Sequence, residues 1–391
     1  MGMIFQDRYL RAWAEIDLSA LEHNFDPARE HLPQGVLLSA VIKANAYGHG
    51  AVAAAKLLEG KADRFAVAMT DEAVELRKAG ITTPIFLLGP VPESDFESIV
   101  AYNIEAAVPS YAFGQALCAY GQKVGKVIPY HVAVDTGMGR IGFDCRETAV
   151  EEVAKLSRLP GGKLVGVFSH YAMADTADKT FATAQTDRFA AFCEGLRERG
   201  VTIPLRHICN SAGLIELNEK FDMVREGIIL YGLQPSHEVD LSRIGGVQPV
   251  MALKSHIAFI KTVQEPTPIS YGCTYVAAPG TVVATVSAGY ADGISRQLSN
   301  RGQVLLHGQR CPILGRVCMD QFMIDITHVP ARVGDTVTIF GRDGDEQITA
   351  DDVADLIGTI GYEVTCLVTP RVPRVYLSQG QMVSIDRPLI Q

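Results

Sequence analysis

Lys43 ends an apolar, β-branched run, VLLSAVI at residues 36–42, and precedes the turn-like stretch ANAYGHG. Such a run is typical of a buried strand. An ammonium at the end of a buried strand loses solvation, which lowers its pKa and makes the amine a better nucleophile. Pyridoxal phosphate is a carbonyl cofactor that proteins hold through such a lysine. The alternative is a lysine whose stem packs on apolar surface while its ammonium reaches water.

Further polar residues follow later apolar runs of the same kind. They are Arg140 after the fifth run, His170 at the end of the sixth, Asn210 and Ser211 at the end of the seventh, and Arg225, Gly227 and Ile228 in the eighth. The Ser211 hydroxyl and the amides of Gly227 and Ile228 would suit a phosphate dianion. Each residue has a structural alternative: a surface ion pair for Arg140 or Arg225, a core histidine for His170, a helix cap for Ser211. Together they favour a single site, provided that the fold brings the run ends together.

Eight apolar runs, each followed by a helix-like segment, predict a fold that brings these run ends together. The runs cover residues 36–43, 65–69, 84–88, 104–108, 129–135, 164–170, 205–210 and 223–231. The longest helical candidate is 179–200, and Asp17-Leu18-Ser19 followed by ALEHNF indicates a capped helix start. Eight strand–helix units predict an α/β fold with an N-terminal (β/α)8 TIM-like barrel, whose active groups collect at the carboxyl ends of the strands. An open doubly wound sheet is the competing architecture.

The pattern changes after about residue 249. Alternating, β-branched runs appear at 253–263, 281–287, 303–306, 322–326, 336–340 and 372–377, with one helix expected at 349–361. These runs predict a mostly β C-terminal domain. We therefore divide the chain into an N-terminal segment 1–13 associated with the C-terminal domain, a barrel 14–249, and a β domain 250–391.

One glycine motif is interpreted as a false match. Residues 137–142, GMGRIG, fit the pattern G-x-G-x-x-G after a strand. A dinucleotide fingerprint should open a helix and have an acidic residue about twenty positions later. Here Phe143 and Asp144 intervene, and the distant position falls in PGGK. A nicotinamide site is not expected.

Composition narrows the function classes. The 391 residues carry 35 Lys and Arg against 44 Asp and Glu, a net charge of −9, which argues against nucleic acid or an anionic membrane as partner. The eight cysteines form no C-x-x-C pair and the histidines show no metal-ligand spacing, so no metal site is expected. We see no signal peptide and no membrane-spanning run, and we expect a cytoplasmic protein.

Nine ordered motifs give the chain a resemblance over nearly its whole length. They are AVIKANAYGHG (40–50), DTGMGRIG (135–142), SHYAMAD (169–175), HICNSAG (207–213), VREGIILYGL (224–233), ISYGCTY (269–275), AGYADG (288–293), GRVCMDQ (315–321) and RVPR (371–374). The chain resembles the alanine racemases, fold-type-III pyridoxal-phosphate enzymes built from a barrel and a C-terminal β domain. The resemblance implies interconversion of L- and D-alanine, with D-alanine destined for peptidoglycan.

The resemblance also implies residue roles. Lys43 carries pyridoxal 5′-phosphate and is one proton-transfer base; Tyr271, from the partner subunit of a homodimer, is the second. Two bases on opposite faces of a planar carbanion can process both enantiomers. His170 contacts Tyr271 and links it to Arg225, which faces the pyridine nitrogen. The remaining implied contacts are Tyr47, Asn210, Ser211, Gly227 and Ile228 for the cofactor, Arg140 and the partner's Met319 for the substrate carboxylate, and Asp175, Tyr290, Arg296 and Asp320 around the site and its entrance.

Two positions depart from the family pattern. Many members have a carbamylated lysine that pairs with the arginine matching Arg140; here that position is Ala133, and we expect chloride or a nearby acid to hold Arg140 instead. A tyrosine often precedes R-V-P-R; here it is Pro370, which predicts a wider entrance or fewer phosphate donors. The alternatives left open are a broader amino-acid (serine) racemase, a non-catalytic pyridoxal-phosphate carrier and a fold-type-III decarboxylase.

Overall fold

Eight short parallel strands form the wall of a barrel in the computed structural model, which describes residues 10–390. The first nine residues of the expected segment 1–13 lie outside the described residues. The barrel strands are β2 (Leu37–Val41), β3 (Arg64–Val67), β4 (Ile85–Leu87), β5 (Ala106–Val108), β6 (Ile128–Ala133), β7 (Gly162–Phe168), β8 (Arg206–His207) and β9 (Met223–Glu226). Most of their residues are buried, as expected of parallel strands covered on both faces.

The wall closes on itself. The described strands pair in the orders β4-β3-β2-β9 and β5-β6-β7-β8. A parallel bridge between Phe86 and Glu105 joins β4 to β5. On the other side, the Arg225 amide in β9 donates to the Cys209 carbonyl just after β8, at 3.1 Å. The predicted (β/α)8 barrel is therefore confirmed, and the open doubly wound sheet is wrong.

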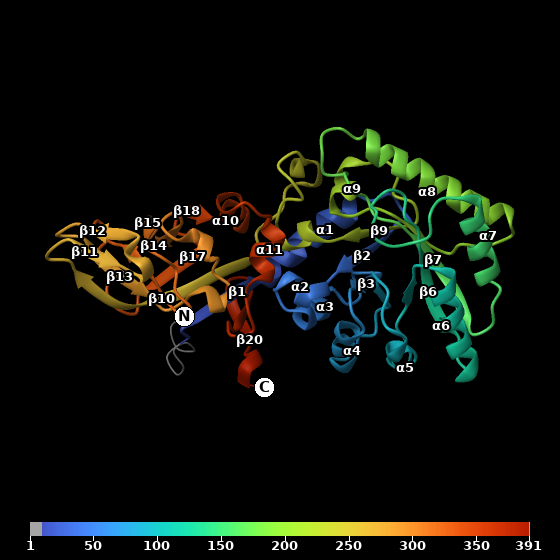
Figure 1. Ribbon diagram of the computed structural model, residues 1–391, viewed down its shortest axis with the longest axis horizontal. Helices are drawn as coiled ribbons and strands as arrows, with labels where there is room; N and C mark the ends of the chain where they lie inside the picture. The colour runs from blue at the N-terminus through green and yellow to red at the C-terminus, as the bar shows by residue number, and fades with distance from the viewer. Residues whose placement is uncertain (1–9, 391) are drawn as a thin grey trace.

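Helices cover the outside of this wall (Figure 1). They are α1 (Leu18–His31), α3 (Ala51–Leu58), α4 (Thr70–Lys78), α5 (Phe96–Ala101), α6 (Tyr111–Lys123), α7 (Glu147–Leu156), α8 (Thr180–Glu198) and α9 (Ser211–Glu216). The predicted cap is confirmed, because Asp17 Oδ1 accepts from the amides of Ser19 and Ala20 at 2.9 and 3.1 Å. The eighth apolar run is only partly a strand: it turns into a 3₁₀ segment (Ile228–Tyr231) after Gly227.

The C-terminal domain is built around a ring of antiparallel strands. In ring order the described strands are β10 (Met251–Thr262), β13 (Val282–Val286), β16 (Phe322–Asp325), β15 (Gln309–Leu314), β14 (Gln303–Leu306) and β17 (Thr336–Asp343), and β17 pairs back to β10. The long strand β10 alternates buried and half-buried residues over most of its length, which is the period of a sheet with one covered face. The expected mostly β domain is confirmed.

Smaller elements flank this ring. Strand β1 (Ala12–Asp17) lies between β10 and β19 (Arg374–Ser378), so the boundary placed after residue 13 falls inside a strand of the C-terminal sheet. Strand β20 (Gln381–Asp386) pairs with β19, and β18 (Glu346–Ile348) pairs with β17. Strands β11 (Thr267–Ile269) and β12 (Tyr275–Ala277) form a separate two-stranded hairpin. The single helix expected at 349–361 is two: α10 (Ala350–Ile357), which ends at Gly358 with φ of 77°, and α11 (Gly361–Cys366).

The two domains meet beside the Lys43 turn. A Cβ added to Gly48 would lie 2.3 Å from the Thr365 carbonyl, so only glycine lets this turn approach α11 so closely. The buried Arg374 donates to the Gly48 carbonyl at 3.0 Å and to the carbonyls of Val368, Thr369 and Val372. This arginine ties the C-terminal domain to the turn that follows Lys43. No helix within residues 10–390 is long and apolar enough to cross a membrane.

Candidate active site

A cavity of about 500 Å³ opens at the carboxyl ends of the barrel strands. Ten of the predicted site residues line it: Lys43, Tyr47, Arg140, His170, Asp175, Asn210, Ser211, Arg225, Gly227 and Ile228. Among the described residues that line the cavity, Asp175 is the only carboxylate, against three cationic side chains. The cavity therefore favours anionic ligands. Within residues 10–390, no group of three or more acidic, histidine or cysteine side chains could hold a metal ion.

Lys43 begins an unusual turn, labelled α2 (Lys43–Tyr47), rather than ending a strand. Residues 44–47 all have positive φ, between 51° and 53°, although none is glycine. A left-handed turn of L-residues costs roughly 1–2 kcal/mol per residue, so its surroundings must hold it in place. Three side chains do so. Glu72 accepts from the Ala44 amide at 2.6 Å, Asn45 accepts from the Ala51 amide at 2.8 Å, and His49 Nδ1 lies 2.9 Å from the Ala46 carbonyl.

The environment of Lys43 suits a nucleophilic amine. Burial lowers the pKa of Lys43, and the positive charge of Arg140 lowers it further. A lower pKa increases the fraction of neutral amine near neutral pH, which is the form that attacks a carbonyl or accepts a proton.

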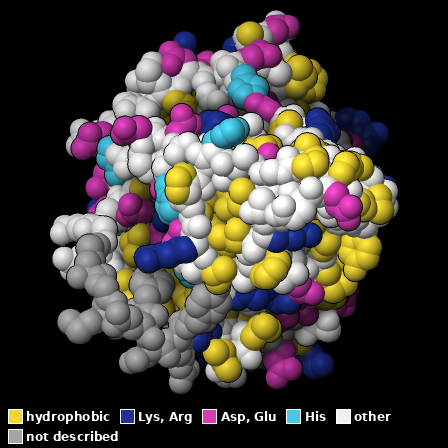
Figure 2. Space-filling view, turned by 90° about the vertical axis from the view of Figure 1, so that its left-hand side faces the viewer, with side chains coloured by type: hydrophobic (Ala, Val, Ile, Leu, Met, Phe, Trp, Pro, Cys, Tyr) yellow, Lys and Arg dark blue, Asp and Glu magenta, His cyan; other side chains and the backbone are white. Residues whose placement is uncertain are grey.

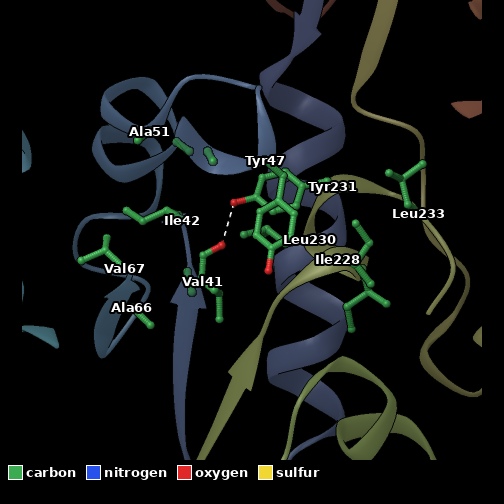
Figure 3. Close-up of a cluster of buried hydrophobic side chains, with 14 of the residues drawn as sticks. Val41, Ile42, Tyr47, Ala51, Ala66, Val67, Ile228, Leu230, Tyr231 and Leu233 are labelled. Carbon is green, nitrogen blue, oxygen red and sulfur yellow. Dashed lines mark hydrogen bonds between the residues drawn. The ribbon is translucent and has the colours of Figure 1, made fainter. Parts of the chain in front are cut away.

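Two hydroxyl groups converge beside Gly227. A Cβ added there would lie 3.4 Å from both the Ser211 Oγ and the Tyr47 hydroxyl, and Ser211 accepts from the Gly227 amide at 2.9 Å. Burial raises the pKa of Tyr47, so this hydroxyl keeps its proton and can donate. Tyr231 packs behind the Tyr47 ring, with ring centroids 4.9 Å apart, and donates to the Val41 carbonyl at 2.8 Å (Figure 3).

Arg225 lies in the cavity wall, almost fully buried. It donates to the carbonyls of Ser169 and Ile208 at 2.8 and 3.1 Å and to His207 Nδ1 at 2.8 Å. Burial lowers its pKa to about 10, which still leaves the guanidinium charged at neutral pH. The same arginine donates to His170 Nδ1 at 3.2 Å.

The bond from Arg225 fixes the state of His170. Burial and the charges of Arg225 and Arg140 lower the pKa of His170 well below its usual value, so the ring is neutral. Because Nδ1 accepts from a guanidinium, the ring proton must sit on Nε2. His170 can therefore donate a hydrogen bond to an acceptor that enters the cavity.

Comparison with known proteins shows the family to which the chain belongs. The family model for the N-terminal domain of alanine racemase matches residues 16–235, and the model for the C-terminal domain matches residues 250–376. The chain belongs to the alanine racemase family. It is 45% identical to an alanine racemase of Methanococcus maripaludis over 93% of this chain and 98% of that protein. It is 44% identical to alanine racemase 1 of Clostridium acetobutylicum, over 97% and 98%.

Solved alanine racemase structures have the same fold. The Clostridium difficile 630 enzyme superposes with a TM-score of 0.94 at 39% identity, over 98% of this chain and all of that one. The Bacillus anthracis enzyme, solved with bound L-Ala-P, gives 0.93 at 37% identity, over 98% and 99%. The chain is thus an isomerase of the racemase class.

Five predicted residues of this alanine racemase family member lie outside the barrel cavity, as far as the described chain shows. Tyr271, in the link between β11 and β12, lies with Met319 and Asp320 around a separate depression on the C-terminal domain. Tyr290 and Arg296 lie in 3₁₀ segments of the same domain. Tyr271 is 70% exposed and Met319 52% exposed. One chain alone does not bring these residues to Lys43.

The structure shows the surroundings of the two positions that depart from the family pattern. Ala133 and Arg140 both line the cavity, but no carboxylate among residues 10–390 pairs with Arg140. The expectation of a nearby acid is therefore wrong within the described chain; chloride stays a prediction. Pro370 is not among the described lining residues, whereas Tyr362 of α11 is. The wider entrance or smaller set of phosphate donors expected from Pro370 stays a prediction.

Sequence reasoning missed Tyr362, Glu72 and His207. The Tyr362 ring lies 6.1 Å from that of Tyr47, centroid to centroid. Its only sequence signal is its place in a short polar helix after a glycine. Glu72 lies in the first turn of α4, where acidic residues are common, so the sequence does not indicate its contact with Ala44. His207 lies in HICNSAG, one of the motifs that carry the resemblance, but the resemblance implies no role for it.

Proposed function

We propose that this chain binds pyridoxal 5′-phosphate around Lys43 and interconverts L-alanine and D-alanine by a two-base mechanism, supplying D-alanine for peptidoglycan. One observation carries the proposal. A half-buried lysine with a lowered pKa opens into the same cavity as the paired hydroxyls of Tyr47 and Ser211 beside Gly227. An amine to bind an aldehyde and hydroxyl donors for a phosphate are the two anchors that this cofactor needs.

The donor set fits the cofactor at each end. Lys43 would hold the aldehyde carbon, and Tyr47, Ser211 and the amides of Gly227 and Ile228 would hold the phosphate. Arg225 would face the ring nitrogen; a guanidinium donates a hydrogen bond but does not readily give up its proton. When bound, the cofactor supplies an electron-withdrawing ring that stabilises negative charge at the substrate α-carbon.

The chain's own residues would move the protons. Lys43, as neutral amine, removes or returns the α-proton on one face of the substrate. The partner subunit's Tyr271 acts on the other face. A phenol with a pKa near 10 is a weak base unless its anion is stabilised, and the Nε2 proton of His170 can donate to that oxygen. Arg140 and the partner subunit's Met319 amide would bind the substrate carboxylate.

A homodimer would complete the site. Figure 2 looks onto the C-terminal domain from the left end of Figure 1 and shows hydrophobic side chains gathered on that face. Phe259, Tyr271 and Val276 of this domain are each more than half exposed. Large exposed apolar side chains on one domain are typical of a surface that another protein covers.

The test is a racemase assay of purified protein over a panel of amino acids, with and without added pyridoxal phosphate. We expect racemisation of alanine in both directions, much slower turnover of serine and larger substrates, and loss of activity after cofactor removal. Activity that is indifferent to the cofactor, or decarboxylation in place of racemisation, would contradict the proposal.

A further inference from the structure

A line of side-chain hydrogen bonds crosses the barrel interior from the cavity to the opposite end. Arg225 Nη1 lies 2.8 Å from His207 Nδ1, His207 Nε2 lies 3.0 Å from His131 Nδ1, and His131 Nε2 lies 2.9 Å from Glu105 Oε2. Arg64 closes the far end with two bonds to Glu105, at 3.1 and 3.3 Å. Both histidines are fully buried.

The two end groups set the direction of every proton in this line. A guanidinium only donates, and an ionised carboxylate only accepts. His131 must therefore carry its proton on Nε2, facing Glu105, and leave Nδ1 bare. His207 must then donate from Nε2 and leave its own Nδ1 bare for Arg225. One tautomer of each ring satisfies all three bonds.

The ionisation states agree with this direction. Burial by itself would raise the pKa of Glu105, but the bond from His131 and the charge of Arg64 outweigh it and bring the value to about 2. Burial lowers the pKa of His131 and that of His207, and the charge of Arg225 adds to the effect at His207. At neutral pH the line runs from the Arg225 cation through two neutral rings to the Glu105 anion, which also binds the Arg64 cation.

We propose that Glu105 and His131 are positioning residues for the reaction, which act through His207 to hold the Arg225 guanidinium in its catalytic orientation. The inference rests on the proposed function, in which Arg225 faces the cofactor. If the side chain at position 105 could donate a hydrogen bond, both histidine rings could instead carry their protons on Nδ1. His207 would then present Nδ1–H to a guanidinium N–H, donor against donor, and Arg225 would lose this support.

Packing alone does not account for these residues. The interior of such a barrel is normally filled by branched aliphatic side chains. Here Phe168 stacks on His207 at 5.4 Å and 10°, and Phe86 contacts both histidine rings. Apolar side chains of similar size would pack in the same space without burying an ion pair. Apolar side chains could not form the line of hydrogen bonds that reaches Arg225.

Glu105→Gln tests the direction of the line, because glutamine keeps the size of the side chain but can donate as well as accept. The matched control is Asp222→Asn. Asp222 forms a two-bond ion pair with Arg206, the residue before His207, yet does not join the line. The readouts are low-field imidazole N–H proton signals, the visible spectrum of bound pyridoxal phosphate, and kcat and KM for alanine.

We expect wild type to show exchange-protected low-field signals that persist from about pH 6 to about pH 9, since neither ring titrates there. Glu105→Gln should shift or lose these signals and alter the cofactor spectrum. It should also lower kcat about tenfold with little change in KM, because a tenfold loss corresponds to one charge-assisted hydrogen bond. Asp222→Asn should match wild type in all three readouts.

The outcomes are separable. If wild type neither binds the cofactor nor racemises alanine, the proposed function fails. If wild type is active and Glu105→Gln matches it in spectrum, signals and kcat, the positioning role is overturned. Should Glu105→Gln not fold, ¹⁵N-histidine spectra of wild type decide: two non-titrating Nε2–H tautomers support the line, and their absence overturns it.

Discussion

The Glu72 carboxylate accepts a hydrogen bond from the Ala44 amide at 2.6 Å, directly after Lys43 in the chain. Its second oxygen accepts from the amides of Ala68 and Met69. One side chain at the start of α4 thus joins the end of strand β3 to the left-handed turn that carries the candidate catalytic lysine. The turn is strained, and this carboxylate is one of the groups that offset the strain.

Glu72→Ala should therefore loosen the lysine turn. Removing the acceptor leaves three amides at exposed or part-buried positions to bind water instead, at roughly 0.5–1.5 kcal/mol for each hydrogen bond lost. We expect a lower melting temperature and weaker pyridoxal-phosphate binding, measured by thermal shift and by titration of the apoenzyme. Glu75→Ala, on the same helix, is the control and should retain wild-type cofactor affinity. Equal affinity in both variants would show that the turn does not depend on Glu72.

Replacing the lysine itself should abolish cofactor retention and turnover together. Lys43→Ala removes both the proposed covalent anchor and one proposed base, and we expect a loss of at least about a thousandfold in kcat. The visible absorbance of the bound cofactor should disappear in gel-filtered protein. Lys56→Ala, an exposed lysine on α3, should behave as wild type in both measurements. Substantial turnover by Lys43→Ala would refute the assignment.

The sequence could predict the barrel and most of the cavity, because both follow from local patterns. Each strand is a short apolar run, and parallel strands direct their carboxyl ends to one rim. Lys43, His170, Ser211 and Arg225 could thus be placed together without knowing any contact. Even β8, only two residues long as a strand, was recognisable from its apolar run and the polar residues after it.

Other features depend on contacts between distant segments and leave little local signal. Tyr362 reaches the cavity only because Gly48 lets α11 approach the lysine turn. The left-handed turn at residues 44–47 contains no glycine, so the sequence gives no sign of positive φ there. Glu105 and His131 look like ordinary strand residues until the barrel closes and places them in line with Arg225.

The second base is testable by isotope exchange. Tyr271→Phe should greatly reduce α-proton exchange from L-alanine while leaving some exchange from D-alanine, because in the proposed mechanism each base serves one face of the substrate. Deuterium incorporation into each enantiomer measures this directly. Tyr275→Phe, on the same hairpin, is the control and should exchange both enantiomers as wild type does. Equal loss from both enantiomers would count against bases on opposite faces.

Mixed dimers test whether Tyr271 serves the partner's cavity. Lys43→Ala and Tyr271→Phe homodimers should each be nearly inactive. If subunits exchange at random, half of the dimers are mixed, and each mixed dimer has one site with both native residues, so about a quarter of wild-type activity should return. No recovery after verified subunit exchange would place both residues in the same subunit's site.

Arg140 should respond to small anions, since no carboxylate of the described chain pairs with it. At constant ionic strength, chloride should lower KM for alanine several-fold relative to a bulky anion, by holding the guanidinium at the proposed binding site of the substrate carboxylate. Ala133→Asp would supply a fixed carboxylate in the same cavity wall and should remove the chloride effect. A KM that is indifferent to chloride in wild type would exclude this role for the anion.

Glu226 should make stability depend on pH in an unusual direction. It is fully buried on β9, and neither carboxyl oxygen has a hydrogen-bond partner among the described residues. Burial raises the pKa of Glu226 well above its usual value, so the folded state holds this proton more tightly than the unfolded chain does. Its contribution to stability is therefore complete below the unfolded pKa and decreases as the pH rises toward the folded pKa, by about 1.4 kcal/mol per pH unit.

Glu226→Gln removes the ionisable group and keeps its shape. The melting temperature of the variant should be close to that of wild type near pH 4.5 or so and exceed it increasingly toward about pH 8, at equal protein concentration. Glu30→Gln, an exposed carboxyl on α1, should leave the difference from wild type constant over that range. If the difference in melting temperature between Glu226→Gln and wild type does not increase with pH, this prediction is wrong. Ionisation of the Glu226 carboxyl would then cost little free energy in the folded state.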